Sequence, residues 1–206
     1  MPQLLRIDAS ARRTDSHSRA MADAFVAEWK KHNPRGKIVL RDVAKNHIPH
    51  VTEQTVAGYF TPTEAHDGML KQAVALSDEL IEELFEADTI LISAPIYNFS
   101  VPSALKAWID HVVRINKTFV VANSGYMGLL KNKKVHVMAT YGAPGYSDPA
   151  IMGGMDFLKP FITSLFSFLG SPDVNVIMAE GTNADAESAK AMKDRTVREA
   201  ALAATG

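Results

Sequence analysis

The stretch Thr89-Ile90-Leu91-Ile92-Ser93-Ala94-Pro95-Ile96-Tyr97-Asn98-Phe99 decides the fold expected for this chain. Its first four residues are β-branched or apolar without interruption, which is typical of a strand buried on both faces of a sheet. Pro95 ends the strand, and in residues 103–115 the apolar side chains recur at helical spacing. A buried strand that leads into a helix is the repeating unit of a parallel α/β sheet.

The same alternation continues in both directions along the chain. Further strands are expected at 4–7, 37–40, 135–138 and 174–178, and further helices at 18–32, 70–86, 157–169 and 184–204. Helix 157–169 is expected to have an aromatic face formed by Phe157, Phe161, Leu165 and Phe168. Five strands separated by helices predict a parallel sheet with helices on both faces. The connections 42–69 and 116–133 are long and irregular, which is typical of lids and interface elements.

Composition excludes several classes of protein. The chain has 206 residues, of which 47% are hydrophobic and 22% charged, and this predicts a single globular domain spanning 1–206. The formal net charge of -1 gives no basic stripe for a nucleic acid, so no nucleic-acid partner is expected. Cysteine is absent, which removes thiolate chemistry and fits a reducing compartment. No apolar run is long enough for a membrane span or a signal peptide, so a cytoplasmic location is predicted.

The segment 8–18, which follows the first strand, is rich in hydroxyl groups and contains no glycine. This excludes the glycine-rich dinucleotide fingerprint and the Walker loop, because both need glycine for close backbone approach. Serine hydroxyls and the free N–H groups at a helix start can hold a phosphate instead, and Arg12 and Arg13 add positive charge. An ordinary helix cap by Asp15 or Ser16 is the alternative.

Two more loops follow strands whose carboxyl ends should meet the first loop at one edge of the sheet. After the third strand, Tyr97 and Phe99 are placed to flank a flat heterocycle, and Asn98 to hydrogen-bond its edge. The alternative is that both aromatic side chains pack as core. After the fourth strand, Gly142 would let the backbone approach a ligand closely, although an ordinary proline-glycine turn is the alternative.

Four segments together resemble a known family. They are the loop with Ser10 and Ser16-His17-Ser18, the run Ala94-Pro95-Ile96-Tyr97-Asn98-Phe99, Thr140-Tyr141-Gly142, and Ala179-Glu180-Gly181. The chain resembles the FMN-dependent NADH:azo and NADH:quinone oxidoreductases, a flavodoxin-like group, over nearly its whole length. The resemblance implies a doubly wound flavodoxin-like sheet in the order 2-1-3-4-5, with FMN at the point where the strand order reverses.

The resemblance also implies which residues hold FMN. Those expected at the phosphate are Ser10, Ser16, His17 and Ser18. Those expected around the ring are Pro95, Ile96, Tyr97, Asn98, Phe99, Thr140, Tyr141, Gly142 and Ala143. Many relatives have a second glycine in place of Ala143 and a histidine just after it, where this chain has Pro144. A proton donor from that histidine is therefore absent here.

The activity implied is two-electron reduction of quinones and azo compounds by NADH or NADPH, in ping-pong order. Hydride would pass through flavin N5, so no side chain is assigned as catalytic. Relatives are homodimers with the active site at the interface, and Phe60, Phe119, Tyr126 and Tyr146 are candidates for a pocket for flat aromatic substrates or for a dimer contact. An electron-carrying flavodoxin is the alternative, but such carriers are usually strongly acidic and lack long loops.

The histidines outside these loops carry weaker signals. His47, His50 and His66 share one connection, but no cysteine or carboxylate completes a metal-ligand set, so no metal is expected. His111 and His136, on a predicted helix and a predicted strand, are expected to be structural.

Overall fold

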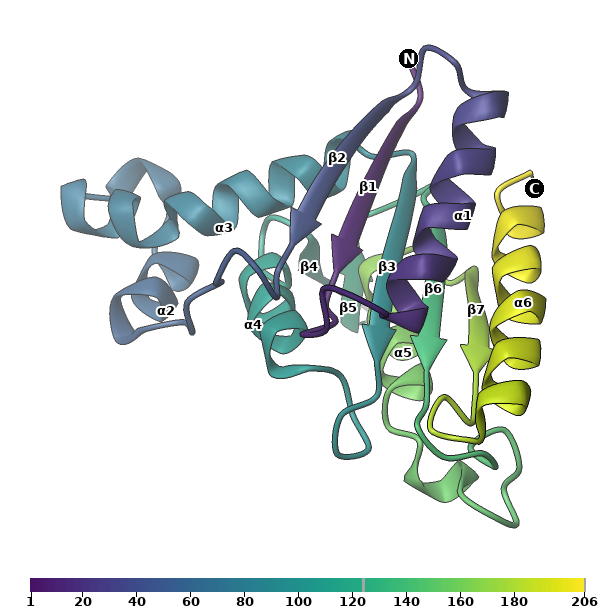
Figure 1. Cartoon of the computed structure of the whole chain (residues 1–206). Helices are drawn as coiled ribbons and strands as arrows, with labels where there is room; N and C mark the ends of the chain where they lie inside the picture. Colours follow the sequence, from purple (N-terminus) through teal and green to yellow (C-terminus); the bar gives the residue numbers. More distant parts are fainter. Residues whose placement is uncertain (124, 206) are drawn as a thin grey trace.

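The computed structural model describes residues 1–123 and 125–205 and is built around a five-stranded parallel sheet (Figure 1). The strands are β1 (Gln3–Asp8), β2 (Lys37–Asp42), β3 (Thr89–Pro95), β6 (Lys134–Thr140) and β7 (Val174–Ala179). Their order is β2-β1-β3-β6-β7, and every neighbouring pair is parallel. The numbering differs from the predicted 2-1-3-4-5 because two strands that the sequence analysis did not predict come before β6.

Helices cover both faces of the sheet. They are α1 (His17–His32), α3 (Gly68–Glu86), α4 (Ser103–Val112), α5 (Lys159–Leu169) and α6 (Ala186–Ala203). Helices α1 and α6 lie on one face, and α3, α4 and α5 lie on the other (Figure 1). The side chains of successive strand residues point to opposite faces of the sheet and therefore pack into separate cores. Leu4 packs with the α1–α6 layer, and Leu5 packs with the opposite layer. No helix in the described part of the chain is long and apolar enough to span a membrane.

The connection 42–69 is not irregular, contrary to the prediction. It contains α2 (Glu53–Phe60) and the short 3₁₀ helix η1 (Thr63–Ala65), and with the start of α3 it projects beyond the β2 edge of the sheet (Figure 1). Helix α2 packs on α3 through Gly58, where a Cβ atom would lie 2.4 Å from Val74 Cγ1. Helix α2 buries only Thr55 and Gly58, so its sequence carries no apolar stripe that would reveal it.

The connection 116–133 also contains regular structure. Strands β4 (Phe119–Ala122) and β5 (Gly125–Gly128) form an antiparallel pair separate from the main sheet. Phe168 of α5 packs against this pair, with its ring centroid 4.9 Å from that of Phe119. Phe157 is predicted to belong to the aromatic face of this helix, but it precedes α5 and is exposed. The side chains that α5 buries are Ile162, Leu165, Phe166 and Leu169.

Candidate functional site

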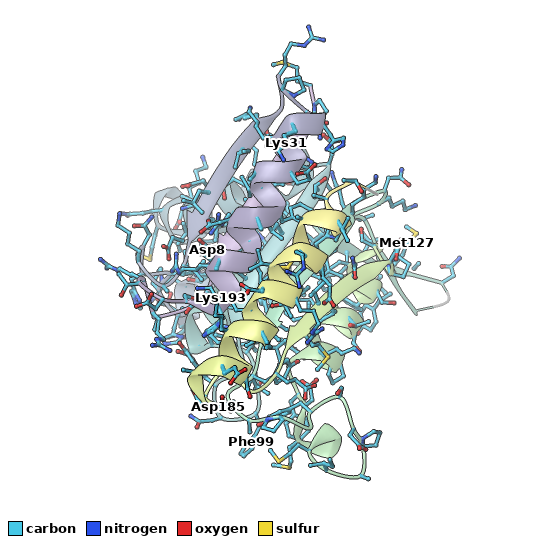
Figure 2. The ribbon with its side chains drawn as sticks, turned by 45° about the vertical axis from the view of Figure 1, so that its right-hand side comes forward. Asp8, Lys31, Phe99, Met127, Asp185 and Lys193 are labelled. Carbon is cyan, nitrogen blue, oxygen red and sulfur yellow. The ribbon has the colours of Figure 1, made fainter. Side chains whose placement is uncertain are left out.

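The carboxyl ends of β1, β3, β6 and β7 lie at one end of the sheet, the lower end in Figure 1, and the loops that follow them line a pocket of about 270 Å³. The predicted site residues in its lining are Ser10, Ser16, His17, Pro95, Ile96, Tyr97, Thr140 and Gly142, and the lining is completed by Arg12, Thr182 and Asn183. Loops from distant parts of the sequence thus converge as the strand order requires. In Figure 2, Phe99 and Asp185 mark this end, and Lys31 marks the opposite one.

Helix α1 points its amino terminus at this pocket. Ser16 caps the helix, since its Oγ accepts a hydrogen bond from the Arg19 N–H at 3.4 Å. The alternative reading of Ser16 as a cap is therefore confirmed, and the same residue also lines the pocket. The first amides of an α-helix have no partner within the helix and carry partial positive charge, which favours an anion here.

Arg12 and Lys193 place positive charge around His17 at the same end of the pocket. Burial, together with the charges of Lys193 and Arg12, lowers the pKa of His17 below its usual value. The Nδ1 atom of His17 is buried and has no hydrogen-bond partner among the described residues. Ser18 differs from Ser16, because its side chain is fully buried below the pocket and lies 3.3 Å from Ser16 Oγ.

Tyr97 and Phe99 belong to an exposed four-residue turn that begins at Tyr97 and ends at Ser100. The Tyr97 N–H donates to the Ser100 carbonyl at 2.9 Å, and the Ser100 N–H donates back to the Tyr97 carbonyl at 3.1 Å. The two central residues, Asn98 and Phe99, have φ values of 46° and 73°, as a type I′ turn requires. Tyr97 is 39% exposed and Phe99 40% exposed, so the alternative that they form core is wrong.

Asn98 faces a second groove, which adjoins the first through Tyr97. This groove of about 510 Å³ is lined by His50, Tyr97, Asn98, Ser100, Val101, Ser103, Lys106, Ala107 and Phe161. It is larger than the pocket beside α1, and its lining is more apolar. A flat ring that lies over Tyr97 would therefore contact both hollows.

The loop after β6 contributes its backbone more than its side chains. Tyr141 is fully buried and its hydroxyl donates to Asp156 Oδ2 at 3.1 Å, and burial raises the pKa of this phenol above its usual value. Only the main chain of Tyr141 is thus left for a ligand. The Ala143 carbonyl accepts a hydrogen bond from the Gly181 N–H at 3.3 Å and Ala143 does not line the pocket.

Thr182 and Asn183 are pocket residues that the sequence analysis missed. The Asn183 N–H donates to the Gly142 carbonyl at 3.0 Å, and a Cβ atom at Gly142 would lie 2.7 Å from Asn183 Nδ2. In its present position the Asn183 amide occupies the space that a Cβ atom at Gly142 would need. The signal that could have found both residues is their place directly beyond the carboxyl end of β7.

Comparisons with known proteins agree with this geometry. The flavodoxin-like fold family matches residues 2–202. An FMN-dependent NADH:quinone oxidoreductase of Xanthobacter autotrophicus is 43% identical over 176 residues, which cover 85% of each chain. One from Hydrogenovibrio crunogenus is 40% identical over 188 residues, covering 91% of this chain and 92% of the relative. The chain belongs to the flavodoxin-like family of FMN-dependent NADH:quinone oxidoreductases.

The membership predicted from the four sequence segments is thereby confirmed. The crystal structure of azoreductase from Bacillus anthracis str. Sterne superposes with a TM-score of 0.90 at 26% identity, covering 99% of both chains. The likeness extends over the whole family fold, including the parts that project from the sheet.

The four residues predicted to line a substrate pocket do not form one common pocket within the described part of the chain. Phe60 is exposed on α2, and Phe119 and Tyr126 form an aromatic cluster on the β4–β5 hairpin with ring centroids 5.9 Å apart. Tyr146 is buried and packs on Tyr141 with ring centroids 4.8 Å apart. The prediction for these four residues rests on their residue type and on their place in or beside long connections. Neither gives information about the distances between the side chains.

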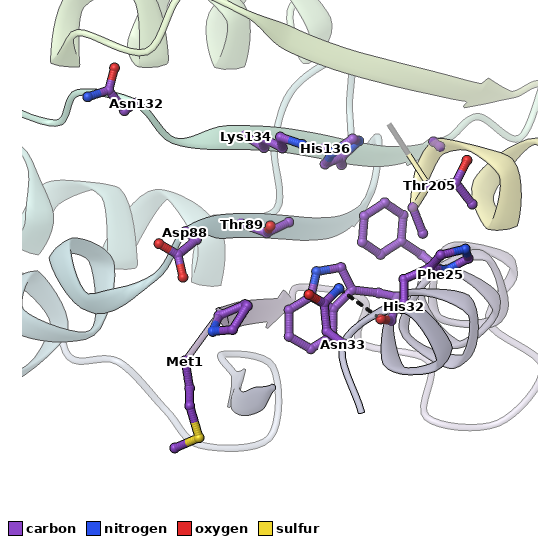
Figure 3. A pocket seen from close by; sticks show the side chains of 14 residues that line it. Met1, Phe25, His32, Asn33, Asp88, Thr89, Asn132, Lys134, His136 and Thr205 are labelled. Atoms are coloured by element: carbon purple, nitrogen blue, oxygen red, sulfur yellow. Dashed lines mark hydrogen bonds between the residues drawn. The ribbon is translucent and has the colours of Figure 1, made fainter. Parts of the chain in front are cut away.

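A larger pocket lies at the opposite, amino-terminal end of the sheet (Figure 3). It measures about 530 Å³, and its side chains come from the end of α1, the starts of β3 and β6, and the two ends of the chain. Family members with an open parallel sheet bind their ligands beyond the carboxyl ends of the strands. We therefore place the functional site at the smaller pocket and not at this one.

Of the three histidines in the long connection, His66 is buried, whereas His47 and His50 are exposed. His66 Nε2 lies 3.0 Å from the carbonyl oxygens of both Gly58 and Thr61, so its ring serves to hold the end of α2. Within residues 1–123 and 125–205, no three histidine, cysteine, aspartate or glutamate residues are grouped so that they could hold a metal ion.

Proposed function

We propose that this chain is an FMN-dependent oxidoreductase that uses NADH to reduce quinones and azo compounds. The observation that carries this conclusion is the 43% identity to an FMN-dependent NADH:quinone oxidoreductase across 85% of both chains, combined with a pocket at the end of the sheet where this family's fold binds ligands. Azo reduction is supported by the likeness to azoreductase over 99% of the chain. The two activities need one site, because both acceptors are flat and uncharged at the reacting atoms.

The residues at the α1 end of the pocket fit the phosphate of FMN. They offer the capped helix terminus, the hydroxyls of Ser10 and Ser16, and a buried His17 Nδ1 without a partner among the described residues. Arg12 and Lys193 add positive charge. A phosphate dianion would thus find charge, hydroxyl donors and free amides within one hollow.

The other end of the pocket fits a flat ring. We place the ring between Pro95, Ile96 and Tyr97 on one side and Thr140 and Gly142 on the other, with Asn98 and Phe99 at its outer edge. Support comes from the exposure of Tyr97 and Phe99, which leaves their faces free to stack. Tyr141 and Ala143, the other two members of the predicted set, do not line this pocket, and contacts of their main chain with the ring stay predictions.

When bound, FMN supplies the redox chemistry and passes two electrons from NADH to the second substrate. The chain's own residues bind and orient it: the α1 end fixes the phosphate, and the turn 97–100 fixes the ring. The turn 97–100 leaves the side chains of Tyr97 and Phe99 exposed, so that a second flat molecule can enter beside Tyr97. No side chain is needed as a nucleophile.

A visible absorption spectrum of the purified protein tests this function. We expect two flavin bands that bleach when NADH is added without air and return when a quinone is added. A flavin spectrum that NADH does not change would favour an electron carrier. Absence of flavin after incubation with FMN would exclude both functions.

We further propose a homodimer as the working unit. Exposed apolar side chains gather on the two segments that project from the sheet, with Phe60 and Met69 on the α2–α3 side, and Tyr126 and Met127 on the hairpin. Such patches are typical of interaction surfaces, and a second copy could bring the scattered aromatic residues together. Light scattering after gel filtration checks this. The single domain 1–206 and the cytoplasmic location stay predictions.

A further inference from the structure

Beneath the pocket, one arginine connects the polar ends of two strands to the first loop. The Arg19 guanidinium donates to both carboxylate oxygens of Asp42, at 2.7 and 3.0 Å, and to Asp8 Oδ2 at 3.0 Å. Its Nη2 also donates to the Ser10 carbonyl at 2.8 Å. The Arg19 side chain is only 13% exposed, so these are largely desolvated, charge-assisted contacts.

The contact with Ser10 sets the direction of a peptide group. A trans peptide holds its C=O and the following N–H in opposite directions. Because the Ser10 carbonyl is turned down to Arg19, the Ala11 N–H is turned toward the pocket, where it donates to the Tyr97 hydroxyl at 3.3 Å. Tyr97 itself lines the pocket, which fixes the side on which this N–H lies.

The same cluster reaches the loop on the other side of the pocket. Asp8 Oδ1 accepts a hydrogen bond from Ser93 Oγ at 2.7 Å, and Ser93 begins the segment that leads to Tyr97. Arg19 and Asp8 therefore hold the first loop at a fixed position relative to the loop after β3. Arg19 itself is not among the residues that line the pocket.

We propose that Arg19 is a positioning residue for FMN: by holding the Ser10 carbonyl away from the pocket, it keeps the Ala11 N–H on the pocket side, where the cofactor's phosphate would replace the Tyr97 hydroxyl as its acceptor. This inference rests on the placement of the phosphate under the proposed function. It assigns affinity for the phosphate to a side chain that does not contact the cofactor.

The substitution Arg19→Lys tests it. Lysine keeps the charge between Asp8 and Asp42, but a single ammonium group cannot reproduce the fork that also reaches the Ser10 carbonyl. The probes are FMN and riboflavin, which share the ring and differ in the phosphate, titrated into the flavin-free protein. We expect Arg19→Lys to weaken FMN binding roughly 10- to 100-fold, the effect of one misdirected hydrogen bond to a charged group, and to leave riboflavin binding unchanged.

Arg41→Lys is the matched control. Arg41 is 16% exposed and pairs with Glu79 and Glu83 on α3, so the same substitution breaks similar ion pairs without touching the first loop. We expect both variants to lower the melting temperature by similar amounts, and only Arg19→Lys to lower the preference for FMN over riboflavin. If Arg19→Lys does not fold, Asp42→Asn releases one support of the same guanidinium and should shift the preference in the same direction.

The outcomes separate this inference from the proposed function. A wild-type protein that binds FMN and riboflavin equally would overturn the placement of the phosphate, and this inference with it. A wild-type preference for FMN that Arg19→Lys retains would overturn the role of Arg19 alone. If Arg19→Lys weakened the binding of FMN and of riboflavin equally, the role of Arg19 would also be overturned, because that result would show general damage to the site.

Discussion

The carboxylate of Glu180 accepts a hydrogen bond from the backbone N–H of Gly145 at 2.6 Å, across 35 residues of sequence. The same carboxylate accepts the N–H groups of Tyr146 at 3.1 Å and Ser147 at 2.7 Å. Glu180 directly follows β7, and the three amides belong to the turn that follows the β6 loop. One side chain therefore fixes the segment 145–147 to the carboxyl end of β7.

Replacing Glu180 with glutamine should loosen this turn. Glutamine offers one neutral acceptor oxygen in place of a charged pair, so we expect a loss of about 1–2 kcal/mol in the free energy of unfolding. The backbone amides of residues 145–147 should exchange hydrogen faster, as measured by mass spectrometry of peptic fragments. Glu187→Gln, in the exposed first turn of α6, is the control. Unchanged exchange at 145–147 in Glu180→Gln would contradict this role.

Ser16 and Ser18 should differ in their effect on FMN, because only Ser16 lines the pocket. We expect Ser16→Ala to weaken FMN binding roughly tenfold, measured by fluorescence titration, and Ser18→Ala to leave it unchanged. Loss of the helix cap also contributes to the first effect. Ser16→Asp restores the cap but places a negative charge beside the phosphate, so it should bind FMN even more weakly. Equal effects of both alanine variants would show that the hydroxyls are placed wrongly.

Asn98 allows the effects of backbone and side chain to be separated. Its φ of 46° is strained for alanine and easy for glycine. If the Asn98 amide binds the ring edge, Asn98→Gly and Asn98→Ala should both weaken FMN binding roughly tenfold, while only Asn98→Ala lowers the melting temperature. Full FMN affinity in Asn98→Gly would show that the turn alone matters at this position.

The strands and the binding end of the sheet could be predicted because their signals are local. Runs such as Thr89–Ile92 are apolar throughout, and the segments beyond them carry the polar residues. Helix α2 could not be predicted, because it packs through Gly58 and Thr55 rather than an apolar stripe. The β4–β5 hairpin was missed for a similar reason, since four-residue strands partly covered by Phe168 carry little alternation.

The side chains of the site were harder to place than its loops. Ser16 and Ser18 are two residues apart in a hydroxyl-rich segment, yet the start of α1 turns one into the pocket and the other into the core. Phe60 and Tyr126 look alike in sequence and lie on different projecting segments. Such differences depend on helix phase and on long-range packing, which residue type and spacing do not determine.

His136 should make folding dependent on pH, for a reason unconnected with the cofactor. It lies on β6 facing the amino-terminal pocket of Figure 3, only 9% exposed, with its ring centroid 4.7 Å from that of Phe25. Its Nδ1 has no partner among the described residues. Burial, with a smaller contribution from the charge of Lys134, lowers the pKa of His136 to about 4, from 6.5 in a free side chain.

Proton binding at His136 determines how the stability of the folded state changes with pH. Between these two pKa values the unfolded chain binds a proton at His136 and the folded chain does not, so stability is complete above about pH 6.5 and falls as the pH drops toward 4. Below both pKa values, the free energy of unfolding is lower by about 3 kcal/mol because of His136. Urea unfolding between these pH values should therefore show a smaller pH dependence in His136→Phe, which keeps the ring contact. His32→Gln, at a side chain 52% exposed in the same pocket, is the control. Equal pH dependence in His136→Phe and the wild type would assign the acid sensitivity to other groups.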